Sequence, residues 1–281
     1  MATYGLVNVG VNDFRLTPTT GVPVQTTDVL AVATLYSAPY IGKRVVLYDV
    51  ASSLWITRFT DEISIALAAI VDTKIYDVFE YWTGAAVALE LSAAWASDTA
   101  RTDAVSRLDG VLTKTADRSR RLVGTIRATA AGQIEFSAAK RMICNVSNRV
   151  LTAMDKRNVT ANNYNANAWR YFNNDATYQI EFVMSEQSGS LYYNCGVSAQ
   201  HSVGGVYGLF GAGLNAAAPA PPTSYPTQID MPRINDPNTT SAVEVEPARV
   251  GWNFISGLQN GRGIGGTIQW NEMALHAALN M

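Results

Sequence analysis

The sequence alternates hydrophobic and polar side chains in many short stretches, and this pattern limits the chain to a fold built from β-strands. The clearest stretch is residues 177–184, where every second residue is large and hydrophobic: Tyr178, Ile180, Phe182, Met184. A period of two places these side chains on one face of a strand. About ten strand candidates of this kind are spread along the chain at close spacing, and few segments carry helix signals. We therefore expect a mainly β fold, an antiparallel β-sandwich or jelly roll with few short helices and long loops.

Two tight turns are predicted, one of them within a hairpin. Thr83-Gly84 separates the aromatic segment Tyr76–Trp82 from the alternating segment Ala86–Leu91, which predicts a hairpin, and Asp109-Gly110 precedes the strand candidate Val111–Lys114. Glycine accepts positive φ without steric cost, as two-residue hairpin turns require. The segment Asp61–Ile70 fits either a strand or a short helix, because its acidic start also suits a helix N-terminus.

The chain has 281 residues, enough for one large domain or two modest ones. Residues 1–36, rich in Val, Thr, Pro and Gly, are expected to form an extended N-terminal arm or the first strands. Residues 37–281 are expected to form the β-sandwich body. Within it, the Ala- and Pro-rich stretch 216–226 predicts an exposed loop, which is either a passive surface segment or an arm that reaches a neighbouring subunit.

The composition is poor in charge. Only 16% of the residues are charged, against a usual share of about 25%, while 48% are hydrophobic and the net charge is −2. Arginine outnumbers lysine, and arginine tolerates desolvated interfaces better. These features predict that part of the surface faces another subunit, so we expect a homo-oligomer. The near-zero net charge argues against nucleic acid as a partner.

The charges that are present are unevenly distributed. Residues 101–157 hold twelve Arg or Lys and five acidic residues, a formal charge of +7, while the rest of the chain sums to −9. These cations either pair with the acidic remainder within the fold, or they face an acidic partner or a neighbouring subunit. For the second alternative, the candidate docking residues are Arg118, Arg120 and Arg121.

Motifs that would indicate catalysis are weak. Residues 261–266 match the GxGxxG pattern, but too little chain follows for a βαβ unit, so we expect a hairpin or bulge there instead. His201 lies near Ser198 and Ser202 without a nucleophile elbow, which favours a loop or surface imidazole over a catalytic base. Two cysteines and two histidines cannot supply a zinc site. We expect no catalytic residue, cofactor or metal.

The first ten residues have no basic start and no long apolar run, so no secretory signal is predicted. The most apolar run, Ile63–Val71, is too short to span a bilayer. We therefore expect no membrane span and synthesis in a cytoplasm. In that compartment Cys144 and Cys195 are expected to be reduced, buried thiols.

A series of short motifs carries a family resemblance. In chain order they are Ser37–Asp49, Trp55, Tyr76–Phe79, Leu89–Leu91, Trp95, Arg101, Leu108–Val111, Arg120–Thr125, Asn145–Val150 and Trp169–Tyr171. The series resembles a β-rich structural module of tailed bacteriophages, found as stand-alone virion proteins and within tail-fibre or head-decoration proteins. The similarity covers about residues 37–200 and, more loosely, 251–266. Val123 and Cys144 depart from it, standing where aromatic residues are expected.

The resemblance implies a virion component without a catalytic site. The leading expectation is a non-enzymatic structural protein that forms a homo-oligomer, first of all a trimer, and attaches to other virion proteins as a capsid decoration, collar or fibre. The alternative is a receptor- or glycan-binding tip of a tail fibre or spike. In that case Tyr164, Trp169 and Tyr171 of segment 158–174 would stack on a host surface glycan, unless they pack into the core. A polysaccharide-degrading spike is a third alternative, weakened by the lack of β-helix repeats.

Overall fold

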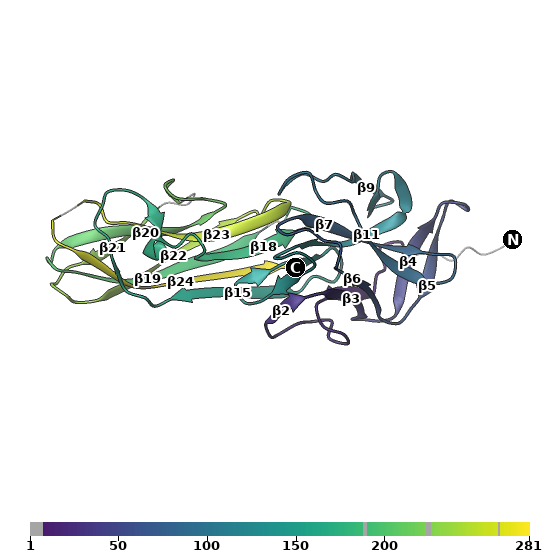
Figure 1. The fold of residues 1–281 in the computed structure, drawn as a ribbon, viewed down its shortest axis with the longest axis horizontal. Helices are drawn as coiled ribbons and strands as arrows, with labels where there is room; N and C mark the ends of the chain where they lie inside the picture. Colours follow the sequence, from purple (N-terminus) through teal and green to yellow (C-terminus); the bar gives the residue numbers. More distant parts are fainter. Residues whose placement is uncertain (1–7, 188–189, 223–225, 264) are drawn as a thin grey trace.

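The structure, a computed structural model, describes residues 8–187, 190–222, 226–263 and 265–281. Its regular secondary structure consists almost entirely of strands, which confirms the mainly β fold class. Among the described residues the helical structure is a single 3₁₀ turn, η1 (Phe172–Asn174). The molecule is elongated, with the N-terminal half at one end and the C-terminal half at the other (Figure 1).

The N-terminal half contains three small antiparallel sheets and part of a fourth. Its strands are β1 (Phe14–Thr17), β2 (Val29–Val32), β3 (Thr34–Pro39), β4 (Arg44–Asp49), β5 (Leu54–Phe59), β6 (Ile63–Ala66), β7 (Ile75–Trp82), β8 (Val87–Leu91), β9 (Val105–Leu108), β10 (Val111–Lys114), β11 (Asp117–Arg127), β12 (Ile134–Phe136), β13 (Lys140–Arg141) and β14 (Ile143–Asn145). The sheet orders are β1-β3-β6, β8-β7-β11-β10-β9 with β14 beside β11, and β4-β5.

The predicted hairpin and the predicted tight turn are both confirmed. β7 pairs with β8, and β9 pairs with β10 through Asp109 and Gly110, whose φ angles of 48° and 87° are those of a tight turn. The segment left open between strand and helix forms strand β6, which pairs with β3. Residues 14–36 lie in strands β1 to β3 and the connections between them, and Leu16 and Leu35 are buried there.

The C-terminal half is a jelly roll. Its strands are β15 (Leu151–Asn158), β16 (Asn162–Asn163), β17 (Arg170–Tyr171), β18 (Gln179–Met184), β19 (Leu191–His201), β20 (Val206–Leu214), β21 (Thr227–Met231), β22 (Asn238–Glu246), β23 (Gly251–Asn260) and β24 (Ile268–Asn280). Apart from the two-residue strands β16 and β17, the eight main strands form two sheets, β15-β24-β19-β22 and β18-β23-β20-β21. Numbered one to eight along the chain, they are ordered 1-8-3-6 and 2-7-4-5, the order of a double Greek key.

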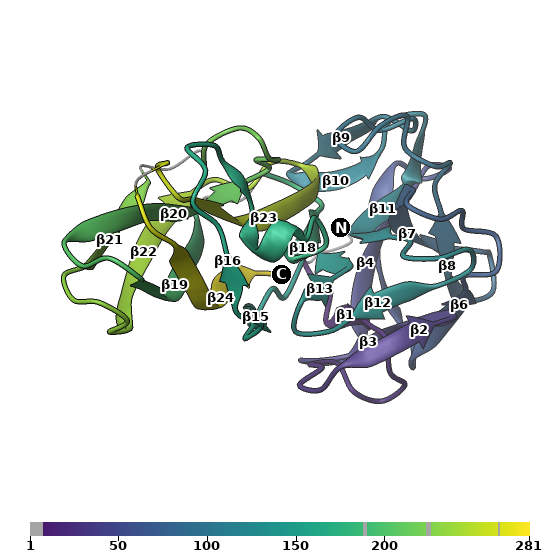
Figure 2. The same cartoon turned by 60° about the vertical axis from the view of Figure 1, so that its left-hand side comes forward.

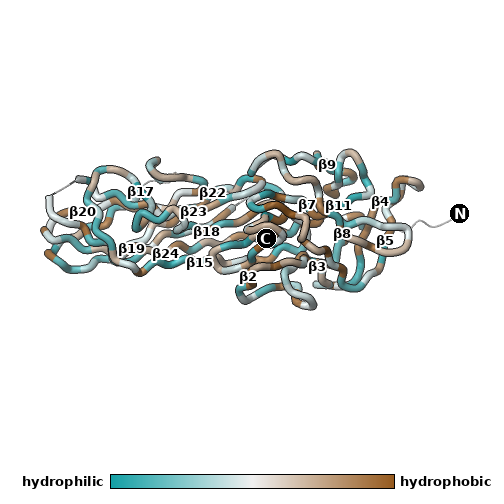
Figure 3. Tube along the Cα trace, in the orientation of Figure 1, coloured by the Kyte–Doolittle hydropathy of each residue, from teal (hydrophilic) through white to brown (hydrophobic). Residues whose placement is uncertain are grey.

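Side chains that are buried at every second position fill the space between the two jelly-roll sheets. On β18, Tyr178 (just before the strand), Ile180 and Phe182 are buried, while Gln179 and Glu181 between them are half-exposed, as the period of two predicts. Trp270 of β24 is also fully buried in this core. A second hydrophobic cluster fills the N-terminal half, and hydrophobic positions concentrate around β7 and β11 in Figure 3. The hydrophobic core therefore divides near residue 150, and not at residue 37.

One shared sheet joins the two halves. β13 pairs in parallel with β18, so that β2, β12 and β13 extend the β18-β23-β20-β21 sheet into the N-terminal half (Figure 2). Three residues of the N-terminal half, Ile75, Trp95 and Cys144, belong to the jelly-roll core. The halves thus pack as one body, with a seam that runs past β7, β18 and β23.

Three local expectations need correction or qualification. The glycine-rich stretch 261–266 is not a hairpin, because β23 and β24 on either side of it lie in different sheets; residue 264 falls outside the described residues. Gly261 is required there because a Cβ would overlap with Asn165. His201 is fully buried at the end of β19, not on the surface, since Gly266 and the segment after it pack over its ring. The described part of stretch 216–226 connects β20 to β21.

Candidate interaction surfaces

The outer face of the β15-β24-β19-β22 sheet carries exposed hydrophobic side chains. On β19 and β22 the outward positions are Tyr192, Asn194, Gly196, Ser198, Thr239, Ser241, Val243 and Val245, and we call these eight residues the β19/β22 face. None of them is charged. Val243 and Val245 are 51% and 59% exposed, although they are hydrophobic. Exposed hydrophobic patches of this kind mark interaction sites.

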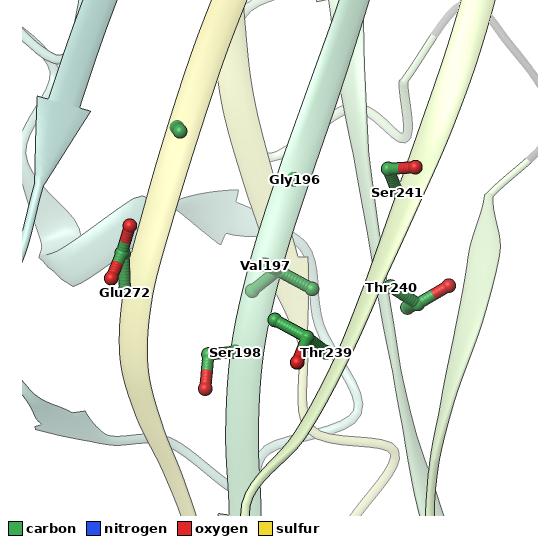
Figure 4. Close-up of a pocket in the computed structure, with 8 residues that line it drawn as sticks. Gly196, Val197, Ser198, Thr239, Thr240, Ser241 and Glu272 are labelled. Atoms are coloured by element: carbon green, nitrogen blue, oxygen red, sulfur yellow. The ribbon is translucent and has the colours of Figure 1, made fainter.

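The β19/β22 face is divided into a ridge and a groove. The ridge consists of Tyr192, Val243 and Val245. Tyr192 on β19 is paired with Val245 on β22, and Asn194 is paired with Val243. Beyond them the residues become small, and an open groove of about 380 Å³ runs over Gly196, Ser198 and their neighbours on β22 and β24. Figure 4 shows these three strands side by side, with Ser198 between Glu272 and Thr239.

The other half of the same sheet face carries paired ionisable groups. Asp155 of β15 lies 2.7 Å from His276 Nδ1 of β24, and Arg157 Nε lies 2.6 Å from Glu272. The hydrogen bond from Arg157 holds the pKa of the Glu272 carboxyl below its usual range. These groups border the β19/β22 face, and Glu272, which pairs with Ser198 in the sheet, also lines one side of the groove.

A second apolar surface lies at the opposite end of the molecule. β5 is an edge strand that pairs only with β4, and none of its six residues is buried, although its sequence is Leu-Trp-Ile-Thr-Arg-Phe. Phe59 is 74% exposed and Leu54 is about half exposed. Natural proteins usually protect such edges with charges or short length, so an apolar edge is a site for pairing with another chain.

The structure separates the three predicted docking arginines. Arg121 is only 3% exposed, and its guanidinium donates to the main-chain carbonyls of Gly10, Val11 and Val46 at 2.8 Å each. Burial lowers its pKa to about 10, the opposing influence coming from Glu80. Arg121 therefore holds the N-terminal segment in place and does not face a partner. The prediction failed here because residues 9–11 and strand β4 cover this part of β11.

Arg118 and Arg120 lie at the half-buried outer end of β11. Arg118 donates to the Ser106 hydroxyl at 2.7 Å. Arg120 donates to Glu90 Oε2 at 2.7 Å and stacks on the Tyr81 ring at 3.9 Å. Other cations of segment 101–157 also pair within the chain: Arg101 with Asp77, Arg149 with Glu186 and Lys114 with Asp103. Pairing with acidic residues outside the segment, one of the two alternatives, accounts for Arg101, Arg120 and Arg149. Lys114 pairs with an acid inside the segment, and Arg118 binds a hydroxyl.

The predicted aromatic platform is half-buried. Tyr164 packs against the jelly-roll core, donates from its hydroxyl to the Ala168 carbonyl at 2.8 Å, and carries Arg170 over its ring at 3.7 Å. Tyr171 lies in β17 beside β23, and Trp169 is half-buried as well. Because the ring of Tyr164 is already covered by Arg170, the three side chains do not form a free stacking surface.

The remaining predictions from the sequence concern the two cysteines, metal ligands and membrane spans. Cys144 and Cys195 are buried free thiols, as predicted, and burial raises the pKa of the Cys195 thiol. Among the residues that the structure describes, no three His, Cys, Asp or Glu side chains converge as metal ligands. Across the same part of the chain, no helix is long and apolar enough to cross a membrane.

Fold and surfaces together define a mainly β protein with a C-terminal jelly roll and two exposed apolar faces. No family model and no curated protein matches the sequence. Similar solved structures include dimeric latent PorU from Porphyromonas gingivalis, with 11% identity and a TM-score of 0.32 over 76% of this chain and 25% of PorU. The mosquito-larvicidal Cry4Aa toxin of Bacillus thuringiensis has 7% identity and a TM-score of 0.27 over 92% of this chain and 50% of the toxin. The chain thus spans a quarter to a half of these proteins, and likeness at this level says nothing about what it binds.

Proposed function

We propose that this protein is a non-enzymatic structural component of a bacteriophage virion, which assembles with copies of itself and attaches to other virion proteins at the capsid or tail. The observation that carries the proposal is the uncharged β19/β22 face, with its exposed Tyr192, Val243 and Val245. The charge-poor composition of the whole chain supports it. Jelly rolls are common in viral capsid proteins, which is an argument from analogy of fold alone.

Self-association through this face follows from its shape. We propose that the ridge of one subunit packs into the groove of the next, with a rotation between subunits that closes the ring. We propose three subunits around one axis. Removing apolar surface from water stabilises the contact by about 25 cal/mol per Å², which must exceed the entropy lost on association. The absence of charge from the eight residues of the face lowers the desolvation cost.

The β5 edge is proposed as the contact to other virion proteins. It lies at the far end of the elongated molecule from the jelly-roll sheets (Figure 1), so both contacts can form at once. An edge strand offers main-chain hydrogen bonds to a strand of the partner, and Leu54 and Phe59 add apolar contact.

Size-exclusion chromatography with light scattering tests the assembly. We expect the purified chain to elute with three times its mass of 30.3 kDa. The double variant Val243→Lys/Val245→Lys should elute as a monomer, because it buries two ammonium groups without partners. The matched control is Val159→Lys, an exposed valine in the loop after β15, which should remain a trimer.

Cosedimentation with particles lacking the protein tests the attachment. Wild-type protein should bind the particles, and Phe59→Ser should bind them at least tenfold more weakly while still forming trimers. A wild-type chain that stays monomeric at high concentration, or that never sediments with particles, contradicts the proposal.

A further inference from the structure

We infer that Asp155 and His276 make subunit assembly sensitive to pH, so that the contact between copies of this chain strengthens as the pH falls from about 8 to about 5.5. The inference rests on the proposed assembly through the β19/β22 face. The two residues lie on the outer face of the same sheet, where Asp155 of β15 is the register partner of His276 of β24. Histidine is the side chain that ordinarily changes its charge within this pH range.

His276 lies between the two parts of the β19/β22 face that are proposed to meet. Two positions after it on β24, Ala278 is paired with Tyr192 of the ridge. Two positions before it, Ala274 is paired with Gly196 and lines the groove. Side chains two positions apart on a strand share one face of the sheet. A subunit that packs over both ridge and groove therefore covers His276 and the aspartate beside it.

The two side chains are already in contact within one subunit. An Asp155 carboxylate oxygen lies 2.7 Å from His276 Nδ1, and each side chain is 53% exposed. At this distance a ring N–H donates to the carboxylate, and protonation of the ring turns this contact into a charge-assisted hydrogen bond. Both groups are open to water in the separate subunit, so a proton can reach the ring before subunits meet.

The neighbouring charged groups keep their charge over the same pH range. On the outer face these are Arg157 on β15 and Glu272 on β24, and their hydrogen bond raises the pKa of the first and lowers the pKa of the second. Lys156 lies on the opposite face of β15, where its ammonium donates to a main-chain carbonyl at 2.6 Å. Among the described residues that border the pair, the outward positions of β19 and the connection 137–139 are uncharged, with the phenol of Tyr192 as their one ionisable group.

The direction of the effect follows from the charge that assembly removes from water. At about pH 8 an imidazole is neutral, so Asp155 is a carboxylate whose nearest cation, Arg157, is already paired. Covering such a carboxylate is costly, because a buried charge needs an opposite charge beside it. With a protonated His276 ring, the pair is neutral as a whole and the cost falls. Assembly therefore takes up protons, and a lower pH favours it.

Sedimentation velocity of the full chain at about pH 5.5 and pH 8 tests the inference. The protein concentration at which half of the subunits are assembled should be at least tenfold lower at about pH 5.5. His276→Gln should lose this dependence, because glutamine can still donate a hydrogen bond to Asp155 but carries no charge. His201→Gln is the matched control and should keep the dependence, because His201 is the other of the chain's two histidines and is buried at the end of β19.

Asp155→Asn should reverse the pH dependence. This variant has no carboxylate to cover at about pH 8, whereas at about pH 5.5 the protonated ring of His276 has lost its counter-charge. The concentration for half assembly should therefore be at least tenfold higher at about pH 5.5 than at about pH 8. A side chain with a purely structural role would weaken assembly at both pH values and leave the direction unchanged.

The results separate this inference from the proposed assembly. Loss of the dependence in His276→Gln together with its reversal in Asp155→Asn supports the inference. Wild-type protein that assembles equally well at both pH values, or less well at the lower one, overturns the inference and leaves the assembly intact. A dependence that persists in His276→Gln, or that keeps its direction in Asp155→Asn, overturns it in the same way. A wild-type chain that is monomeric at every pH overturns both.

Discussion

Arg121 of β11 and Glu80 of β7 face each other in the register of the sheet, and both side chains are buried. Each binds the N-terminal segment: Arg121 through the main-chain carbonyls of Gly10 and Val11, and Glu80 through the amide of Asn12 at 2.9 Å. A pair of opposite charges in the sheet interior thus anchors the first described residues of the chain.

Replacing Arg121 by Ala should lower the free energy of unfolding by about 3–5 kcal/mol, because Glu80 and several carbonyls lose their partner in a buried site. Equilibrium urea denaturation measures this. Arg118→Ala on the same strand is the control and should cost less than about 1 kcal/mol, since Arg118 is half-buried. Equal losses in the two variants would contradict the anchoring role.

Glu80→Gln should change how stability depends on pH. Burial raises the pKa of Glu80, while Ser37, Arg121 and Asn12 oppose the rise. Between the ordinary pKa near 4.5 and the raised pKa, the folded protein keeps a proton on Glu80 that the unfolded chain releases. The contribution of this protonated carboxyl to the free energy of unfolding is therefore full below pH 4.5 and is lost as pH rises through the pKa of the folded state.

The difference in unfolding free energy between Glu80→Gln and wild type should therefore shift in favour of the variant as pH rises above about 4.5. Denaturation curves at several pH values between 4 and 8 test it. The pKa of Asp77 is also raised by burial, but that group is present in both proteins and cancels in the difference. A difference that is constant across this range would show that Glu80 does not titrate as described.

A charge swap separates the two roles considered for Arg120. Arg120→Glu places a carboxylate beside Glu90 and Asp117 and should cost about 1 kcal/mol in unfolding free energy. Adding Glu90→Arg should restore most of that loss. If Arg120 also docks onto an acidic partner, the swapped protein should bind particles more weakly than wild type despite its restored stability. Wild-type binding by the swapped protein would leave Arg120 with a purely internal role.

Gly251→Ala should loosen the seam. Gly251 has a φ of +93°, and a Cβ would overlap with the carbonyl oxygen of Asp98. Gly84→Ala is a matched control, because its φ is +97° but the space around it is open. Both variants share the strain of positive φ, so the overlap with Asp98 should make Gly251→Ala less stable than Gly84→Ala by at least about 1 kcal/mol in unfolding free energy. Equal midpoints would show that the seam yields without cost.

Much of the fold could be predicted from local patterns. The alternation over residues 177–184 predicted β18, and Asp109-Gly110 predicted the tight turn that precedes β10. β15 and β22 were missed because their outward residues, such as Leu151 and Val243, are hydrophobic and blur the alternation. The exposed hydrophobic side chains that hid these strands from pattern reading are the ones that mark the candidate interface.

The candidate sites depended on contacts that are remote in sequence. Arg118, Arg120 and Arg121 are neighbours along the chain, yet Arg121 is buried because residues 9–11 and β4 cover it. The pairing of β15 with β24 brings Asp155 beside His276, and no spacing rule in the sequence connects these two residues.

By itself, the sequence determined that the chain forms short antiparallel strands in a sandwich or jelly roll, because side-chain period and turn residues act through neighbours a few positions apart. Tertiary structure alone decided which faces stay uncovered, which arginines are buried and which ionisable groups meet on one face. These properties depend on the order of strands within each sheet, which is set by packing between segments up to a hundred or more residues apart and leaves no local trace in the sequence.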